Sequence, residues 1–476
     1  MSQTNLTRRD FITFSAMAAA MLGFSACASL AKQPRKPRPI APGAKIRVAQ
    51  IGCGGKGFSD IMGVKDEEVV ALCDVDWTRP NVKKLFETFP KAKRYTDFRK
   101  MLVEMDNEID AVGVATPDHM HFLPACMAIM LGKHVYIQKP LTQTVGEARE
   151  LLRLARLNGV CTQMGNQGHS MEGIRLVREW FQGGLLGEVR EAQIWTNRSA
   201  AKGPDGRERV VWPQGMAEWP KGGTPPEGFS QDLFLGRAPE RPYSPDIHPF
   251  KWRGYIDYGC GALGDMACHL MDAAYWNLEL GAPTSVELKK IVQPSKIAFP
   301  KSAIVEYQFP ERTVNGKKLP PVKVTWSEGG EKPAKPKQME ATRQLAHGGQ
   351  LLIGSKGTVY DGNDYCNSPR FIPESFHKEL VDGGKMPPKT IPRPDPIGNP
   401  HIEWIKAIRA NNPLAAGSNF EYSVPFTEMV CLGTMAILVG GKFTWDPVAM
   451  KTSNPEADKL LYPTYRRGWD PNAIVA

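Results

Sequence analysis

The sequence predicts an α/β chain of two domains, the first of which is built on a doubly wound parallel sheet. Its 476 residues are about three times the usual length of one domain. Short apolar runs typical of buried strands alternate with helical stretches along the first third of the chain, a pattern typical of parallel sheets. A glycine-rich turn follows the first of these runs directly. We therefore expect one domain over residues 46–165 and a second over residues 166–476.

Five apolar runs are the expected strands of the parallel sheet: residues 46–51, 68–74, 109–115, 134–137 and 160–164. The stretch 123–131 has the periodicity of a helix. Thr144 and Glu147 form a capping box, which predicts the start of another helix, and Gly159 is the residue expected at its end. Strands and helices thus alternate along the whole of this domain.

The glycine-rich turn fits the pattern G-x-G-x-x-G, with the residues Gly52, Cys53, Gly54, Gly55, Lys56 and Gly57. Its glycines permit a tight turn, let the backbone approach a pyrophosphate, and let the next helix pack closely on the strand. The second strand ends at Asp74, where a carboxylate can accept hydrogen bonds from the adenosine ribose. The sequence therefore predicts a Rossmann domain that binds a dinucleotide. The acid favours NAD over NADP, although Arg79 lies close enough in sequence to weaken this preference.

A lysine follows the fourth expected strand, in the run Gln138-Lys139-Pro140. The carboxyl end of a parallel strand is where such sheets hold their ligands, and Pro140 keeps Lys139 extended. A partly desolvated lysine beside a positively charged nicotinamide loses its proton more easily, which suits acid–base catalysis. Taken alone, the run is more often a surface lysine before a turn.

Asp265 and His269 follow a second glycine-rich stretch, residues 258–264, where the pattern becomes helical. Side chains four residues apart share one face of a helix. The carboxylate can orient the imidazole, and the imidazole can accept a proton from a sugar hydroxyl. Taken alone, such a pair is typical of a solvated ion pair or of a core histidine.

With the glycine loop, the Lys-Pro turn and the Asp-x-x-x-His pattern in this order, the chain resembles the Gfo/Idh/MocA family of NAD(P)-dependent oxidoreductases. The resemblance covers almost the whole chain after its N-terminal leader. It implies that Lys139, Asp265 and His269 carry catalysis, with Asp272 a weaker candidate for substrate binding or helix support. It also implies an α+β second domain with an open, mainly antiparallel sheet, whose outer face forms homodimers or homotetramers.

The cofactor and substrate contacts follow from the motifs and the resemblance together. The expected cofactor-binding residues are the six of the glycine loop, Asp74, Thr116, Pro117, His119, His121, Gln138 and Lys139. The expected substrate-binding residues are Gln167, His169, Arg253, Tyr258, Asp265 and His269. Gln138 departs from the family, which usually has Glu there, and this bears on the hydrogen bonding around the nicotinamide and the lysine.

The second domain carries its own strand and helix signals. The expected strands are residues 188–196, 285–292, 303–309, 322–326 and 350–353. A helix is expected over 400–410, with Asn399 as its N-cap. A long stretch rich in Pro and Gly, residues 197–261, carries several Trp and Tyr residues. Two readings of these aromatics stay open: they stack on sugar rings, or they bury the loop against the domain.

The N-terminus resembles a twin-arginine signal over residues 1–28, with Arg8 and Arg9 before the apolar run 11–24. Cleavage after residue 28 predicts a periplasmic protein, and Cys27 in an imperfect lipoprotein box offers a lipid anchor as the alternative. Residues 29–45 are expected to form a basic, proline-rich linker. The apolar run is too short and too polar to predict a membrane span.

Composition excludes several classes of protein. The net charge is +10, but the basic residues do not form a stripe with interleaved aromatics, which argues against a nucleic-acid partner. Nine scattered cysteines without a C-x-x-C pair argue against a disulfide scaffold and against a metal site.

The leading interpretation is an exported, NAD-dependent oxidoreductase that acts on a secondary hydroxyl of a sugar, glycoside or cyclitol. The alternative is an NAD-dependent glycosidase or lyase that works through oxidation, elimination and re-reduction. A third class is a non-catalytic protein that binds NAD or a sugar.

Overall fold

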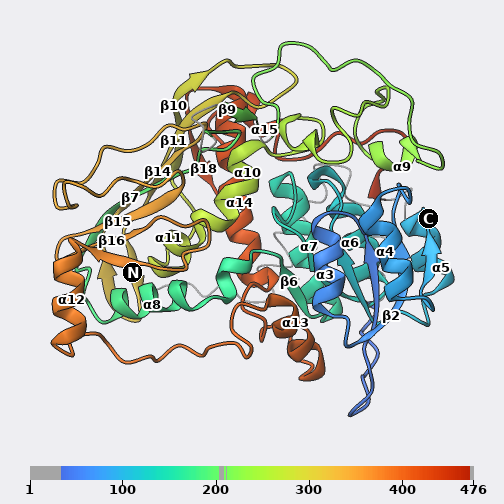
Figure 1. Ribbon diagram of the computed structural model, residues 1–476, viewed down its shortest axis with the longest axis horizontal. Helices are drawn as coiled ribbons and strands as arrows, with labels where there is room; N and C mark the ends of the chain where they lie inside the picture. Colours follow the sequence, from blue (N-terminus) through green and yellow to red (C-terminus); the bar gives the residue numbers. More distant parts are fainter. Residues whose placement is uncertain (1–33, 203–207, 211, 472–476) are drawn as a thin grey trace.

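The computed structural model describes residues 34–202, 208–210 and 212–471 (Figure 1). The expected signal, its cleavage site and Cys27 lie outside the described residues. Helix and strand labels follow Figure 1.

The part of the expected linker that is described does not stand apart from the first domain. Arg35 N–H donates to Asn158 Oδ1 at 2.9 Å, and the Arg38 guanidinium donates to the carbonyl of Ile109 at 2.6 Å. Residues 34–45 therefore lie along the domain, where we had expected a tether.

The first domain is a parallel sheet of six strands with helices between them. The strands are β1 (Arg47–Ile51), β2 (Glu68–Cys73), β3 (Lys93–Tyr95), β4 (Ala111–Val114), β5 (His134–Ile137) and β6 (Thr162–Met164). The helices are α3 (Lys56–Gly63), α4 (Pro80–Thr88), α5 (Phe98–Glu104), η1 (Asp118–Met120), α6 (Phe122–Met130) and α7 (Val145–Asn158). The strand order β3-β2-β1-β4-β5-β6 changes direction between β1 and β4, which places a ligand crevice at the carboxyl ends of these strands.

The predicted strands of this sheet lie within about two residues of the observed ones at each end, and the capping box is present. The Thr144 hydroxyl accepts the N–H of Glu147 at 3.4 Å, and Gly159 ends α7 with φ +71°. β3 was not predicted. Its three residues are Lys, Arg and Tyr and are mostly exposed, so it has no apolar run.

The second domain contains a nine-stranded, mainly antiparallel sheet in the order β17-β16-β15-β7-β14-β11-β10-β18-β19. Only β7 and β14 pair in parallel within it. Its strands are β7 (Val189–Trp195), β10 (Ser285–Val292), β11 (Ser302–Phe309), β14 (Val322–Ser327), β15 (Gly349–Gly354), β16 (Thr358–Asp361), β17 (Arg370–Ile372), β18 (Lys442–Asp446) and β19 (Lys451–Thr452). This confirms the predicted fold class.

The remaining elements are short hairpins and helices. The hairpins are β8 (Ala200–Lys202) with β9 (Glu208–Val210), and β12 (Arg312–Val314) with β13 (Lys317–Leu319). The helices are η2 (Gln167–Ser170), α8 (Glu172–Gln182), α9 (Gln231–Leu235), η3 (Lys251–Gly254), α10 (Gly261–Leu270), α11 (Asp272–Asn277), α12 (Glu374–Asp382), α13 (Pro400–Arg409), α14 (Phe420–Val439) and α15 (Pro455–Asp458). Asn399 caps α13, as predicted, and accepts the N–H of Ile402 at 3.1 Å.

Helix α14 lies at the centre of the molecule, between the two sheets (Figure 1). It packs against α7 of the first domain and against α10 and β10 of the second. Among the described residues it is the one helix long and apolar enough to cross a membrane, and 78% of its most apolar window is buried inside the molecule. One hydrophobic cluster runs through both domains, from Ala49 on β1 through Leu432 on α14 to Trp469 near the C-terminus.

Residues 212–260, which we call the covering segment, cross from the second domain to the first. Helix α9 of this segment lies against η1 of the first domain, where the Phe234 carbonyl oxygen is 3.2 Å from His119 Nε2. Ser230 N–H donates to the carbonyl of Val75 at 3.1 Å, and His248 Nε2 lies 2.8 Å from Asp76 Oδ2. The covering segment is therefore fixed over the loop that follows β2.

Candidate functional site

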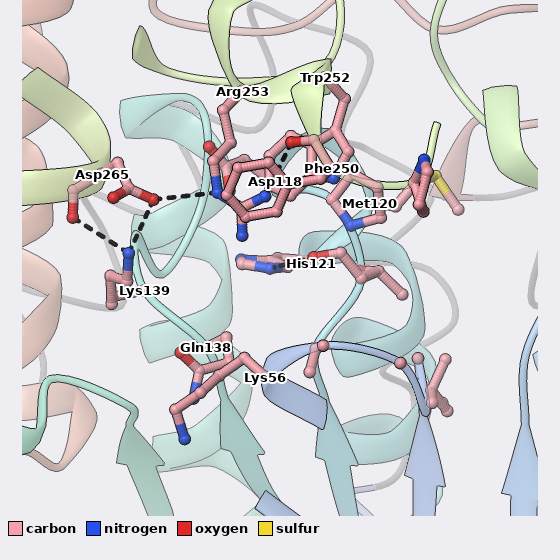
Figure 2. A pocket seen from close by; sticks show the side chains of 18 of the residues that line it. Lys56, Asp118, Met120, His121, Gln138, Lys139, Phe250, Trp252, Arg253 and Asp265 are labelled. Atoms are coloured by element: carbon pink, nitrogen blue, oxygen red, sulfur yellow. Dashed lines mark hydrogen bonds and ion pairs between the residues drawn. The ribbon is translucent and has the colours of Figure 1, made fainter. Parts of the chain in front are cut away.

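A cavity of about 380 Å³ lies at the carboxyl ends of β1, β2, β4 and β5. The glycine loop and Asp74 line one part of it, and Lys139, Asp265 and His269 line another. Phe250, Trp252 and Arg253 of the covering segment also line it (Figure 2). The predicted cofactor loop and catalytic residues thus share one cavity.

The glycine loop has the form that a dinucleotide requires. Gly52 has φ +79°, a backbone conformation that favours glycine. A Cβ on Gly57 would lie 1.9 Å from the Gly52 carbonyl oxygen, so helix α3 can approach the strand only with glycine there. A Cβ on Gly54 would lie 2.2 Å from the Arg79 guanidinium. The glycines therefore let helix α3 and the Arg79 guanidinium lie close to a loop that lines the cavity, and the residues present fit NAD.

Asp74 lies at the end of β2 and lines the same cavity. Its Oδ2 accepts the N–H of Cys53 at 2.7 Å, and its Oδ1 accepts the N–H of Asp76 at 2.8 Å. Burial raises the pKa of Asp74, although these two N–H groups and the charge of Arg79 oppose the change. The carboxylate is positioned to receive ribose hydroxyls.

Replacing Asp74 with Ser is expected to shift cofactor preference towards NADP. The change removes the charge that repels a 2′-phosphate and leaves the nearby Arg79 guanidinium to attract it. We expect affinity for NAD to fall roughly tenfold and the ratio of NADP to NAD affinity to rise, as measured by fluorescence titration of both cofactors. An unchanged ratio would show that Asp74 does not select the cofactor.

Lys139 is held by an acid from the second domain. Its Nζ lies 2.8 Å from Asp265 Oδ1 and 3.1 Å from the Asp265 carbonyl oxygen, as Figure 2 shows. Arg253 Nε approaches the same Oδ1 at 3.3 Å. Although burial opposes the shift, the charges of Lys139 and Arg253 hold the pKa of Asp265 well below its usual range. Asp265 is therefore a carboxylate that fixes two cations at the cavity.

His269 lies one turn beyond Asp265 on α10 but does not pair with it as we had expected. Within the described residues, its Nδ1 is buried without a hydrogen-bond partner. Its ring packs edge-on against Tyr365, with 5.0 Å between the ring centres. Burial, and then the charge of Lys139, lower the pKa of His269 to about 3. The imidazole is therefore neutral near physiological pH, and its low pKa makes it a weak base.

Gln138 is buried at the carboxyl end of β5, and its amide nitrogen donates to Asp60 Oδ2 at 2.8 Å. Asp60 also bonds Lys56 and lies 2.9 Å from His401 Nε2. A carboxylate from α3 thus already stands beside the position where the resembled family usually has Glu. The position of Asp60 explains why residue 138 is an amide, because a Glu there would place a second buried carboxylate next to that of Asp60.

Replacing Gln138 with Glu is expected to destabilise the protein as pH rises. Two buried carboxylates within hydrogen-bond distance cannot both ionise freely, so the folded state raises the pKa of one of them. The resulting loss of stability is small in acid and complete above that raised pKa. We expect the Gln138→Glu variant to lose about 2 kcal/mol of unfolding free energy at pH 8, as measured by urea unfolding. The double variant Gln138→Glu/Asp60→Asn should recover most of it, and equal losses in both variants would contradict this account.

Five expected contact residues have side chains directed away from the cavity or do not line it. They are Cys53, Gly57, His119, His169 and Tyr258. The roles of Cys53 and Gly57 are structural, in the turn described above.

The His119 ring points to backbone carbonyls of the covering segment. Its Nε2 lies 3.2 Å from the Phe234 oxygen, and its Nδ1 lies 3.3 Å from the Tyr258 oxygen. The His169 Nδ1 lies 3.1 Å from the carboxylate of Asp272, behind the cavity. These histidines join segments of the structure and do not line the cavity, so their contact with the ligand stays a prediction.

The aromatic residues of the covering segment form two groups: some pack inside the segment, and others line the cavity. Trp219 stacks on Tyr255, with 5.3 Å between the ring centres, inside the small hydrophobic core of the covering segment. These two aromatics therefore follow the reading in which they bury the loop. Trp212 and Trp252 are almost fully buried and also line the cavity. Phe250 is 46% exposed and stands at the cavity wall.

Asp118 is a cavity residue that the sequence analysis missed. It follows the Thr-Pro pair at the end of β4, and its Oδ2 accepts the N–H of Cys260 at 3.1 Å. Burial, and then the charge of Asp265, raise the pKa of Asp118 to about 7. The sequence did point to Asp118, because it lies between Pro117 and His119, both of which were predicted to contact the cofactor. No group of three or more metal-binding side chains occurs among the residues that the structure describes.

Comparison with known proteins agrees with the fold. Residues 46–166 match the oxidoreductase family with the NAD-binding Rossmann fold, Gfo/Idh/MocA. Residues 206–309 match the C-terminal alpha/beta domain of the same family. Both domains carry Gfo/Idh/MocA family matches. The first domain is therefore an NAD-binding domain, and the chain has the fold of an NAD-dependent oxidoreductase.

Relatives and solved structures show where the resemblance lies. A glycosyl hydrolase family 109 protein of Shewanella amazonensis is 26% identical over 207 residues, which are 39% of this chain and 44% of that protein. The chain spans less than half the length of the curated relatives it matches.

Two solved structures share the fold over most of this chain. The WlbA dehydrogenase of Bordetella pertussis, in complex with NADH and UDP-GlcNAcA, is 16% identical with a TM-score of 0.56, over 84% of this chain and 99% of that one. An inositol dehydrogenase homolog of Azotobacter vinelandii, complexed with NAD+, is 17% identical with a TM-score of 0.54, over 86% of this chain and 99% of that one.

Proposed function

We propose that this chain is an NAD-dependent oxidoreductase that oxidises a secondary hydroxyl of a sugar, a glycoside or a cyclitol. The observation that carries the proposal is the position of Lys139. Its ammonium group, fixed by Asp265 at 2.8 Å, lines the same cavity as the glycine loop and Asp74. The structural neighbours named as dehydrogenases support the same class of reaction.

The side chains of the cavity supply what such a reaction needs. NAD, when bound, supplies the hydride acceptor. Lys139 Nζ, once it is an uncharged amine, and the neutral imidazole of His269 are the two groups that can receive the hydroxyl proton, and both remain candidates for the base. Arg253 is held by Asp265 at the cavity wall, where its remaining N–H groups can orient substrate oxygens.

The test is mass spectrometry of a panel of sugars, glycosides and cyclitols after incubation with the purified protein, with and without added NAD. We expect one product lighter by two hydrogens, formed in proportion to the added NAD. Aglycone release without added acceptor would replace this function with bond cleavage. No conversion of any panel member by the NAD-loaded protein would contradict both.

The second candidate is a glycosidase or lyase that uses NAD as a recycled catalyst. The match to glycosyl hydrolase family 109 proteins favours it. The covering segment, fixed over the loop after β2, also suits a cofactor that stays bound through many turnovers. Cleavage of a chromogenic glycoside without net change in NADH would select this candidate.

We further propose twin-arginine export to the periplasm and assembly as a homodimer or homotetramer. The paired Arg8 and Arg9 before an apolar run support export, with a lipid on Cys27 as the alternative to cleavage after residue 28. Mass spectrometry of the mature N-terminus separates these two outcomes. Sedimentation equilibrium of the mature protein tests the assembly.

A further inference from the structure

The cavity holds two buried aspartates with very different surroundings. Asp265 has two cationic partners, Lys139 Nζ at 2.8 Å and Arg253 Nε at 3.3 Å. Among the described residues, no cation is bonded to the side chain of Asp118, which accepts from the backbone N–H of Cys260 at 3.1 Å and from the thiol of the same residue. Figure 2 shows Asp118 beside Arg253, on the side of the cavity opposite Gln138 and Lys56.

The contrast in partners separates the ionisation of the two acids. Asp265 keeps its charge because both cations are bonded to it, and that charge disfavours a second one nearby. Burial, and then the charge of Asp265, raise the pKa of Asp118 to about 7, although the facing charges of Arg253 and Lys139 and the hydrogen bond from the Cys260 side chain oppose the change. When the surroundings of two acids in one site separate their pKa values in this way, one acid commonly stays charged and the other keeps its proton.

We propose that Asp118 acts as a carboxylic acid that donates a hydrogen bond to a hydroxyl oxygen of the bound sugar, next to the oxygen that Lys139 and His269 engage. It is then a specificity-determining residue, and its proton is not transferred. This inference rests on the proposed function, because it requires a substrate with neighbouring hydroxyl groups. Its position beside Arg253, in the same cavity as Lys139 and Asp265, assigns it to the substrate and not to the cofactor.

The first test measures KM and kcat of the NAD-loaded enzyme on both sides of neutral pH. Wild-type KM should rise as pH passes about 7, because the donor loses its proton there. Asp118→Asn, whose amide remains a donor at every pH, should lose this rise. Asp118→Ala should raise KM about tenfold at low pH and leave the Kd for NAD unchanged. The matched control Asp382→Asn, on the exposed end of α12, should behave like wild type.

Two results would overturn the inference: a pH-dependent KM that persists in Asp118→Asn, or a loss of NAD affinity in Asp118→Ala without a change in KM. Either can occur while sugar oxidation itself is observed, so failure here is distinct from failure of the proposed function.

A second test does not depend on turnover. The infrared absorption of protonated carboxyl groups should weaken as pH rises through about 7, and the difference between wild type and Asp118→Asn should isolate the share of Asp118. The subtraction removes Glu328, a buried acid whose pKa burial raises to about 8. If the two proteins give the same titration, Asp118 is ionised and the inference is wrong, whether or not a substrate is known.

Discussion

Lys139→Ala is expected to lower kcat for sugar oxidation roughly 10³-fold while NAD remains bound. In the proposed function the lysine takes part in proton transfer, whereas the glycine loop and Asp74, which line the cavity from other elements, would hold the dinucleotide. Single-turnover formation of NADH measures the first effect, and fluorescence titration of NAD measures the second.

Lys385→Ala is the matched control, because this lysine pairs with Glu379 on an exposed face of the second domain. It should leave both quantities unchanged. Turnover of Lys139→Ala within about twofold of wild type would mean that the lysine is not required, and His269 would then be the remaining base.

Asp265→Asn is expected to be the most destabilising of the conservative changes in the cavity. It keeps the shape of the side chain but leaves Lys139 and Arg253 without their shared counter-charge in a largely buried site. Breaking a buried ion pair by removing one partner costs about 3 kcal/mol, and kcat/KM should fall about 10²-fold because Lys139 loses its support. Urea unfolding and steady-state kinetics at pH 7 measure the two effects.

The pH dependence of this loss has a definite sign. The pKa of Asp265 is depressed in the folded protein, so its contribution to stability is complete above its unfolded pKa and disappears as pH falls towards the depressed value. The difference between wild type and Asp265→Asn should therefore be largest at neutral pH and shrink in acid. Asp246→Asn, in the exposed pair with Lys251, is the control and should change stability by less than about 1 kcal/mol. A loss of equal size in both variants would contradict the special role of Asp265.

The sequence predicted the inner strands of both sheets because they carry the apolar runs or alternation that a core requires. It missed β16 and β17 at one edge of the second sheet and β18 and β19 at the other. β10 was predicted to the residue, whereas β3 was missed because its side chains are charged or half-exposed at the sheet edge. The glycine loop and the capped ends of α7 and α13 were predictable for a similar reason, since their chemistry is local.

Side-chain direction in loops was not predictable, because distant segments determine it. His119 turns towards carbonyls of residues 234 and 258, more than a hundred positions along the chain. Asp265 was expected to serve its neighbour His269, but a lysine from another domain bonds it instead. Asp118 was passed over although both of its neighbours were selected, since only burial beside Asp265 distinguishes it from a solvated loop aspartate.

The hydrophobic cluster that runs through both domains has a consequence for how a cofactor enters. Since Ala49 of the first sheet, Leu432 of α14 and Trp469 belong to one cluster, the two domains should unfold together. We expect a single calorimetric transition for the whole chain, with no separate melting of the NAD-binding domain. Because the two domains share one core, we expect exchange of NAD to proceed by local detachment of the covering segment. Its rate should then follow the strength of the contact between His248 and Asp76.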